Sequence, residues 1–276
     1  MSSVASNWGW GVVEPVFAIR DLSFAYGPQP VLRGLDLEII PGRFHGLVGP
    51  NGCGKTTLLD LMTGLLRPAA GSVRFQGRPL NAWRAGELAR ALSLTPQEPG
   101  LGFPYTVRET VLMGRHAFIP RFSAPAPRDE ELVEAALARL DLTGLAHQPV
   151  TELSGGEKQR VILARSLAQA APVMLLDEPT NNLDVRHALA ALGELERLVR
   201  AEGRTVVAVL HDLNLAAAFC DQLILMDQGR VVAQGPTPEA LCAANLESVF
   251  GVRAAVRWDE FAQGRVVVFQ KNGGLA

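Results

Sequence analysis

The spacing of apolar residues along the chain predicts a buried parallel sheet with a second β-layer packed on it. Residues 44–48 predict a short buried strand, and near-continuous apolar runs at residues 173–176 and 205–210 are typical of strands that are covered on both faces. Residues 16–20 and 35–39 instead alternate apolar and polar side chains, which predicts half-exposed strands of an antiparallel layer. Together these patterns indicate an α/β fold.

The strand pattern disappears between about residues 98 and 165. Proline and glycine separate three stretches with helical spacing there, at about 106–114, 128–141 and 155–171. The proline-rich run 119–127 is expected to be a non-helical connector. We therefore predict that an inserted helical subdomain, about residues 98–165, interrupts the β-structure.

Beyond this insertion, the chain returns to alternating helices and strands. Residues 185–201 predict a helix, and residues 223–226 and 230–233 predict a hairpin. Residues 252–257 and 266–269 predict edge strands near the C-terminus.

The composition fits one α/β domain with an ample core. The chain has 276 residues, of which 48% are apolar and 20% are charged. We interpret residues 1–15 as a flexible tail and residues 16–276 as a single domain that ends in a short extension, about 236–276. The net charge of −2 provides no basic field for nucleic acid, so we expect no nucleic-acid partner. The three cysteines lack metal-ligand spacing, and their odd number suits a reducing cytosol.

Hydropathy gives no sign of a membrane-spanning segment. No run approaches the ~18 apolar residues that a spanning helix needs. The first 16 residues carry neither a basic start nor an apolar run of signal-peptide length. Any role at a membrane is therefore expected to require a partner protein.

The clearest chemical signature is the stretch Gly49-Pro50-Asn51-Gly52-Cys53-Gly54-Lys55-Thr56-Thr57, which fits the phosphate-binding pattern G-x-x-x-x-G-K-[ST]. Its glycines let successive backbone N–H groups converge on a phosphate. Lys55 is placed to reach the terminal phosphates, and the Thr56 hydroxyl is placed to ligate Mg²⁺. A strand pattern precedes the loop and a helix pattern follows it, so the helix N-terminus faces the phosphate. The sequence therefore predicts a nucleotide site.

Two carboxylates close the apolar run 173–176. The carboxyl edge of parallel strands is where open α/β sheets bind ligands. We expect Asp177 to hold Mg²⁺, directly or through water, and Glu178 to orient or deprotonate the water that attacks the γ-phosphate. The alternative is an acidic turn capped by Pro179 with no chemical role, and the upstream phosphate loop argues against it.

A second loop, Leu153-Ser154-Gly155-Gly156-Glu157-Lys158-Gln159, opens a helix with a hydroxyl and two glycines. Taken alone, this is the pattern of an ordinary helix N-cap. It occurs, however, together with the phosphate loop, Asp177-Glu178, Asn181-Asn182-Leu183-Asp184 and Val209-Leu210-His211-Asp212. From about residue 16 to 250, this order and rough spacing resemble the ATP-binding cassette (ABC) ATPases. The resemblance implies a P-loop NTPase core with a parallel sheet, an antiparallel β-layer and an inserted helical subdomain.

The resemblance also implies a role for each motif residue. Tyr26, which we expect in a loop before the phosphate site, would stack on adenine. Gln97 would sense Mg²⁺ and the attacking water and couple to a membrane partner, and His211 would contact the γ-phosphate. Asp184 matches the aspartate that links the two sites of a dimer.

The site residues fall into three overlapping sets. The catalytic set is Glu178, His211 and Gln97. The metal set is Thr56, Gln97 and Asp177. The nucleotide-binding set is Tyr26, Gly49, Pro50, Asn51, Gly52, Cys53, Gly54, Lys55, Thr56, Thr57, Ser154, Gly155, Gly156 and Asp184.

The family resemblance implies a head-to-tail homodimer that binds ATP and Mg²⁺. Each of two ATP molecules would lie between the phosphate loop of one subunit and the signature loop, residues 153–159, of the other. The γ-phosphate would hold the dimer closed, because it supplies contacts that the open state lacks. Hydrolysis would open the dimer, and the helical subdomain would transmit this motion to a membrane partner.

Three further stretches resemble one subgroup of the family, the importers of iron-siderophore, haem and cobalamin. They are residues 107–122, 237–241 and 246–252. This resemblance implies a peripheral subunit on the cytoplasmic face of the cell membrane. It would work with integral membrane permease subunits and with a periplasmic or surface substrate-binding protein. The alternatives are an ATPase subunit for another substrate, such as a metal ion or an exported compound, and a soluble ABC ATPase without a transport role.

The stretch after Gln97 is rich in large apolar side chains, which predicts a docking groove for a permease helix lined by parts of residues 97–122. Core packing is expected to account for some of these side chains. The candidates are Leu101, Phe103, Tyr105, Phe118 and Phe122.

Overall fold

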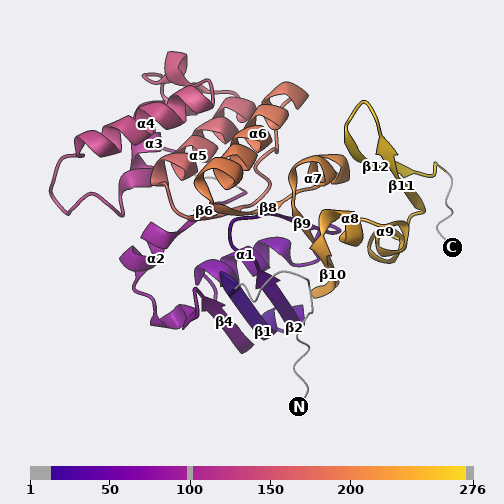
Figure 1. Ribbon diagram of the computed structural model, residues 1–276. Helices are drawn as coiled ribbons and strands as arrows, with labels where there is room; N and C mark the ends of the chain where they lie inside the picture. The colour runs from indigo at the N-terminus through magenta and orange to yellow at the C-terminus, as the bar shows by residue number, and fades with distance from the viewer. Residues whose placement is uncertain (1–13, 98–101, 272–276) are drawn as a thin grey trace.

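The computed structural model describes residues 14–97 and 102–271 (Figure 1). Its centre is a six-stranded sheet in the order β10-β9-β3-β8-β7-β6. The strands are β3 (Phe44–Val48), β6 (Leu92–Thr95), β7 (Val173–Leu176), β8 (Thr205–Val209), β9 (Gln222–Asp227) and β10 (Arg230–Pro236). All neighbours pair in parallel except β9 and β10, which form the expected antiparallel hairpin. Every residue of β3, β7 and β8 is buried, which confirms the interpretation of the apolar runs.

A second, antiparallel sheet lies below the first in Figure 1, in the order β2-β1-β4-β5. Its strands are β1 (Phe17–Tyr26), β2 (Gln29–Ile39), β4 (Ala70–Phe75) and β5 (Arg78–Pro79). The prediction that Tyr26 lies in a loop was wrong, because it ends β1 and pairs with Gln29. The register shifts between Ile19 and Leu22 and again before Phe24, so the alternation of side chains breaks and the strand continues past the pattern.

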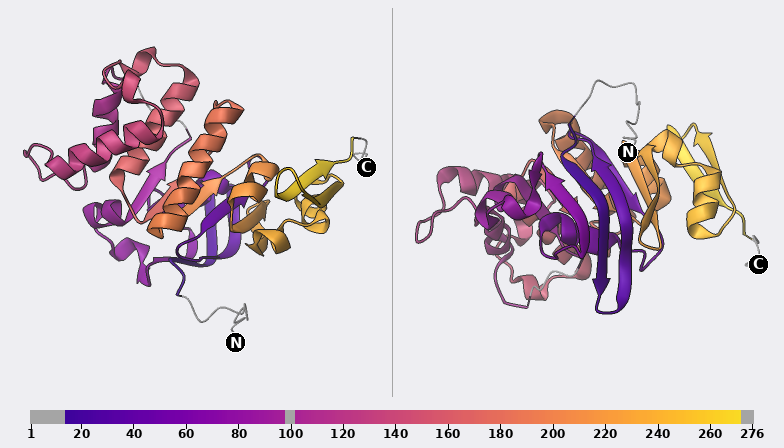
Figure 2. Two further views of the ribbon diagram at one scale, coloured as in Figure 1. Left: turned by 45° about the horizontal axis from the view of Figure 1, so that its top comes forward. Right: turned by 90° about the horizontal axis from the view of Figure 1, so that it is seen from below.

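Helices fill the stretch where strand signals are absent. They are α3 (Val107–Leu112), the 3₁₀ turn η2 (Met113–Arg115), α4 (Pro127–Arg139) and α5 (Gly155–Gln169). Figures 1 and 2 show them together at one end of the molecule, away from the antiparallel sheet. Their positions agree with the helical stretches expected from the sequence.

The central sheet separates two hydrophobic clusters. The smaller cluster packs α1 (Lys55–Thr63) between the antiparallel sheet and one face of the central sheet. The larger cluster covers the other face with α6 (Val185–Glu202) and α7 (Leu213–Phe219), and it continues without interruption into α3, α4 and α5. The helical part therefore shares its core with the sheet that carries the candidate site.

The C-terminal part folds back beside α7. It contains α8 (Thr237–Ala240), α9 (Ala243–Phe250), β11 (Ala254–Asp259) and β12 (Gly264–Phe269). The expected edge strands are instead a separate two-stranded sheet, β11-β12, because β10 already closes that edge of the central sheet. The side chain of Asn214 holds this hairpin, since its Oδ1 accepts a hydrogen bond from the Val267 N–H at 2.7 Å.

Two short helices, α2 (Ala85–Ala91) and α7, were not expected from the sequence. In the described ranges, no helix combines the length and the apolar character needed to cross a bilayer. Of the expected N-terminal tail, residues 1–13 lie outside the described residues.

Candidate functional site

The phosphate-binding loop connects β3 to α1 and is shaped by two glycines. Gly54 precedes α1 with φ 103°, a left-handed value that side-chain-bearing residues rarely adopt. A Cβ on Gly49 would lie only 2.1 Å from the Met226 carbonyl oxygen of β9. Both positions therefore require glycine, and the N-terminus of α1 opens directly onto the loop.

Lys55 spans this loop from the inside. Its Nζ donates to the carbonyl oxygens of Gly49 at 2.8 Å and Pro50 at 2.9 Å, and the residue is buried. Cys53 Sγ lies 3.8 Å from the same ammonium. Burial raises the pKa of the Cys53 thiol, so this side chain is a neutral packing group.

The residues expected to hold Mg²⁺ meet beside the loop. Asp177 is 2% exposed, and its Oδ1 has no hydrogen-bond partner among residues 14–97 and 102–271, while its carboxylate accepts a hydrogen bond from the Thr56 side chain. Burial raises the pKa of Asp177, and the neighbouring Glu178 carboxylate raises it further. A buried carboxylate with an unused oxygen next to a hydroxyl fits Mg²⁺.

The remaining ligands of such an ion come from elsewhere. The described residues contain no cluster of three or more histidine, cysteine or acidic side chains that could bind a metal alone. Mg²⁺ is commonly held by one or two carboxylates together with substrate phosphates and water. Asp177 and Thr56 therefore fit the protein's share of a metal site that a nucleotide would complete.

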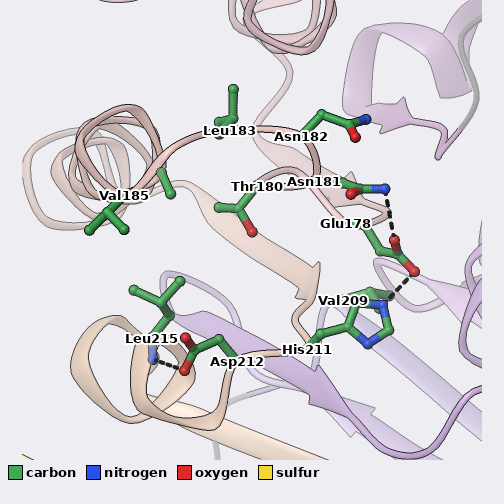
Figure 3. A pocket seen from close by; sticks show the side chains of 11 residues that line it. Glu178, Thr180, Asn181, Asn182, Leu183, Val185, Val209, His211, Asp212 and Leu215 are labelled. Carbon is green, nitrogen blue, oxygen red and sulfur yellow. Dashed lines mark hydrogen bonds and ion pairs between the residues drawn. The ribbon is translucent and has the colours of Figure 1, made fainter. Parts of the chain in front are cut away.

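Glu178 lies between two side chains that orient its carboxylate. His211 Nε2 is 2.5 Å from Oε1, and Asn181 Nδ2 donates to Oε2 at 3.3 Å (Figure 3). These residues line a hollow of about 350 Å³, together with Thr180, Asp212 and apolar side chains of α6 and α7. A carboxylate held in this way can accept a proton from water.

The signature loop forms the N-cap of α5. Ser154 Oγ accepts from the Glu157 N–H at 3.3 Å, and the Glu157 carboxylate accepts from the Ser154 N–H and hydroxyl at 2.8 and 2.7 Å. These hydrogen bonds hold the pKa of Glu157 below its usual value. The reciprocal cap fixes the helix start, while Ser154 and Gly155 stay exposed to solvent.

Asp184 caps the next helix, α6, by accepting from the His187 N–H at 2.8 Å. Its side chain is exposed. Two further expected residues also lie on the surface: Tyr26, which is 52% exposed and packs edge-to-face on Phe24 at 4.9 Å, and Gln97, which follows β6. The structure thus brings Thr56 to Asp177 and His211 to Glu178, and it places Tyr26, Gln97 and Asp184 on separate exposed elements.

Sequence reasoning missed two residues of this site. Asn181 contacts the Glu178 carboxylate, and Gln159 Nε2 donates to the Glu178 carbonyl oxygen at 3.1 Å. Both stand inside quoted motifs, but no local pattern shows that a residue on α5 reaches a loop 19 positions further along the chain.

Comparison with known proteins agrees with this geometry. Residues 32–181 match the family model described as ABC transporter. The chain belongs to this family. Three ABC relatives are 40–44% identical to it: the cobalamin import ATP-binding protein BtuD of Halobacterium salinarum, the hemin import ATP-binding protein HmuV of Streptomyces coelicolor and the ferric enterobactin transport ATP-binding protein FepC of Escherichia coli K12.

The three alignments differ in how much of each relative they cover. The BtuD alignment is 43% identical and covers 86% of this chain, which spans only 59% of that protein's length. The HmuV alignment is 44% identical and covers 86% of this chain and 84% of the relative. The FepC alignment is 40% identical and covers 93% and 96%.

Solved ABC structures share the fold. One is an inward-facing conformation of a metal-chelate type ABC transporter, with a TM-score of 0.79, 29% identity and coverage of 93% of this chain and 97% of that one. Another is a dimeric ATP-binding cassette in a post-hydrolysis state bound to ADP and phosphate, with a TM-score of 0.71, 27% identity and coverage of 80% and 98%. The expected fold, a P-loop NTPase core with an antiparallel layer and inserted helices, is confirmed.

Proposed function

We propose that this chain is the ATP-hydrolysing subunit of a membrane importer for metal chelates. One observation carries the ATPase assignment, which is the pair of adjacent carboxylates Asp177 and Glu178. The Asp177 carboxylate accepts a hydrogen bond from Thr56 of the phosphate loop. The Glu178 carboxylate contacts the side chains of His211 and Asn181. Glu178 is thereby suited to activate water, and Asp177 is suited to bind a metal ion. Transfer of a phosphoryl group to water requires both functions.

The chemistry follows from these positions. The loop N–H groups and the Lys55 ammonium bind the β- and γ-phosphates. Asp177 and Thr56 would hold Mg²⁺, which would neutralise charge on the phosphates. Glu178 orients the attacking water and accepts its proton, and His211 keeps the carboxylate in place and faces the γ-phosphate.

The exposed residues take the roles that need a partner molecule. We assign adenine stacking to Tyr26 and sensing of the metal and the attacking water to Gln97. Ser154, Gly155 and Gly156 contact ATP bound by a second copy of the chain, and Asp184 links the two sites. The dimeric relative bound to ADP and phosphate supports this homodimer. A closed dimer would enclose each nucleotide between one phosphate loop and the partner's signature loop.

The metal-chelate class is supported by the relatives. The importers named for cobalamin, hemin and ferric enterobactin all carry a chelated metal. We accordingly place the chain on the cytoplasmic face of the cell membrane as a peripheral subunit. Its partners in this proposal are integral membrane permeases and a periplasmic or surface substrate-binding protein.

The organisation that serves this function is a single domain, residues 16–276. Within it, residues 98–165 act as the moving helical subdomain, and residues 236–276 form the extension that includes the β11-β12 hairpin. The shared hydrophobic core supports the single domain, since the helices share one core with the central sheet rather than folding apart from it.

The permease is proposed to dock on the surface that precedes and follows α3. The exposed fractions of Phe103, Tyr105 and Phe122 are 69%, 47% and 96%. Exposure of this much apolar surface to water is unfavourable, which is typical of a site that binds a partner. Phe118 does not belong to this surface, because it is half-buried with the Arg115 guanidinium 3.9 Å from its ring centre. Leu101 lies outside the described residues.

The experiment that tests the docking surface compares two phenylalanines. Phe122→Asp should abolish membrane association and transport while sparing basal ATPase activity. Phe261→Asp is the matched control, because Phe261 is 100% exposed on the β11-β12 hairpin at the opposite end of the molecule (Figure 1). Equal effects of the two substitutions would contradict the proposed surface.

The experiment that tests the whole function is uptake by the reconstituted complex. The chain is purified with its membrane partner, placed in liposomes with ATP, and assayed with haem, a ferric siderophore and cobalamin. Uptake of one of them by the wild type but not by Glu178→Gln supports the proposal. Transport of a sugar, amino acid or lipid instead would overturn the substrate class, and failure to recover any membrane partner would favour the soluble alternative.

A further inference from the structure

The backbone of Glu178 adopts a conformation that its neighbours must hold. Its φ is 52°, in the left-handed region that residues with a side chain seldom occupy outside strained or functional positions. The direction of the Glu178 carboxylate depends on this backbone, because the backbone sets where the side chain that meets His211 begins (Figure 3). Groups that hold the peptide therefore also aim the proposed general base.

Two donors hold the Glu178 carbonyl oxygen. The Asn181 N–H donates to it at 3.1 Å within the same turn, and the Gln159 side-chain amide donates to it at 3.1 Å from another element. Gln159 is 5% exposed and lies in the second turn of α5. The second hydrogen bond is therefore a partly buried link between α5 and the turn that carries Glu178 in the same chain.

The first turn of α5 touches the same segment at its other end. A Cβ added to Gly156 would lie 3.0 Å from the Asn182 carbonyl oxygen and 3.8 Å from Leu183 Cδ2. Helix α5 therefore contacts the segment 178–183 at two points. Gln159 hydrogen-bonds to Glu178, and Gly156 packs closely against Asn182. Ser154 and Gln159 are about 7.5 Å apart along the axis of the same helix. The exposed cap and the residues that contact segment 178–183 therefore belong to one rigid element.

We propose that Gln159 is a positioning residue for Glu178 and that it couples the signature loop to the general base of the same subunit. Force on Ser154–Gly156 from a nucleotide on the partner subunit moves α5, and α5 moves the Glu178 peptide. Nucleotide bound at one site of the dimer then affects the general base of the other site through contacts inside one chain. This inference rests on the proposed ATPase function.

The chain offers a matched control on the same helix. Gln169, in the last turn of α5, also donates its side-chain amide to backbone carbonyl oxygens, those of Ala89 at 2.7 Å and Leu92 at 3.0 Å. It makes no described contact with residues 178–183. Methionine has nearly the length of glutamine and no donor, so Gln159→Met and Gln169→Met remove the same kind of hydrogen bond from the two ends of α5.

The test measures steady-state ATP hydrolysis and melting temperature of the full chain and its two variants. Losing one partly buried hydrogen bond that positions the general base should lower kcat about 5–10-fold in Gln159→Met. The KM for ATP should change less than about twofold, because the phosphate loop is untouched. Gln169→Met should lower the melting temperature similarly and leave kcat within about twofold.

A double-mutant cycle separates positioning from a general structural role. If Gln159 acts through Glu178, single-turnover hydrolysis in a Glu178→Gln background should lose less than about twofold when Gln159→Met is added. The same loss in both backgrounds, or equal losses of kcat for Gln159→Met and Gln169→Met, would overturn the inference while leaving the ATPase function intact. A wild-type chain that hydrolyses no ATP, alone or with its membrane partner, would overturn both.

Discussion

Replacing Arg115 by methionine should loosen the helical part of the molecule while leaving the phosphate loop in place. The Arg115 side chain is 6% exposed, and its Nε donates to Asp129 Oδ1 at 2.9 Å. Its Nη1 donates to the carbonyl oxygens of Ala168 at 3.0 Å and Gln169 at 2.8 Å. One guanidinium thereby joins the end of α3, the start of α4 and the end of α5, and methionine removes every one of these bonds.

The magnitude follows from what is left behind. Asp129 is 9% exposed at its side chain and would remain as a buried carboxylate without a counter-charge, a situation that costs about 3–5 kcal/mol. The unfolding entropy is about 2.1 cal/mol/K per residue, so in a chain of 276 residues such a loss corresponds to a decrease in melting temperature of about 5–9 °C. Arg115 also holds the pKa of Asp129 below its usual value, so the loss should shrink as the pH falls and protonates the carboxylate.

The measurement is urea and thermal unfolding of matched variants. Arg128→Met is the control, since Arg128 pairs with Glu131 at 3.1 Å on the surface, with side chains 74% and 64% exposed, and should cost less than about 1 kcal/mol. Asp129→Asn added to Arg115→Met should recover part of the stability. It removes the unpaired charge while its amide oxygen can still accept from the Ala126 N–H.

The reasoning fails if the charge balance is not what matters. A difference of less than about 1 kcal/mol between Arg115→Met and Arg128→Met would refute it. So would a double variant that is no more stable than Arg115→Met alone, because the buried carboxylate would then carry no cost.

Three further predictions concern the candidate site. Lys55→Ala should weaken ATP binding at least about tenfold in equilibrium titration, because it removes a charged hydrogen-bond donor from the phosphates. Glu178→Gln should bind ATP normally but lower kcat by about 10²–10⁴-fold, and it should accumulate as an ATP-bound dimer in light scattering unless Ser154→Arg is also present. Asp177→Asn should melt higher than the wild type without nucleotide and lose Mg²⁺-dependent turnover. Burial raises the pKa of Asp177, so its ionised form costs stability above that pKa, and the gap in melting temperature should close as the pH falls.

Strands and loops with a strictly local signature could be predicted from the sequence. The runs that became β3, β7 and β8 are apolar at nearly every position because both faces of these strands are covered. The phosphate loop could be identified because its glycines, Lys55 and Thr56 follow one another directly. The candidate nucleotide site could therefore be predicted from the sequence before the fold was known.

Features that depend on distant contacts could not be predicted in this way. Helix α2 buries none of its seven residues and α7 buries two, so neither carries a clear amphipathic pattern. The Met113–Arg115 stretch suggested a family subgroup, yet only the fold reveals that Arg115 is a buried ion-pair partner. The link from Gln159 to Glu178 likewise exists only because the first two turns of α5 pack against residues 178–183.

The order of the central sheet also determines when the nucleotide site can form during synthesis. Strand β3, which leads into the phosphate loop, pairs with β8 on one side and β9 on the other, and Gly229 donates its N–H to the Cys53 carbonyl oxygen at 3.1 Å. At the pace of a ribosome, about 5–20 residues per second, the loop emerges some 10–30 s before these supports exist. ATP binding therefore cannot assist the early folding of the nascent chain. A chain truncated before Gly229 should be unable to bind the nucleotide when it leaves the ribosome.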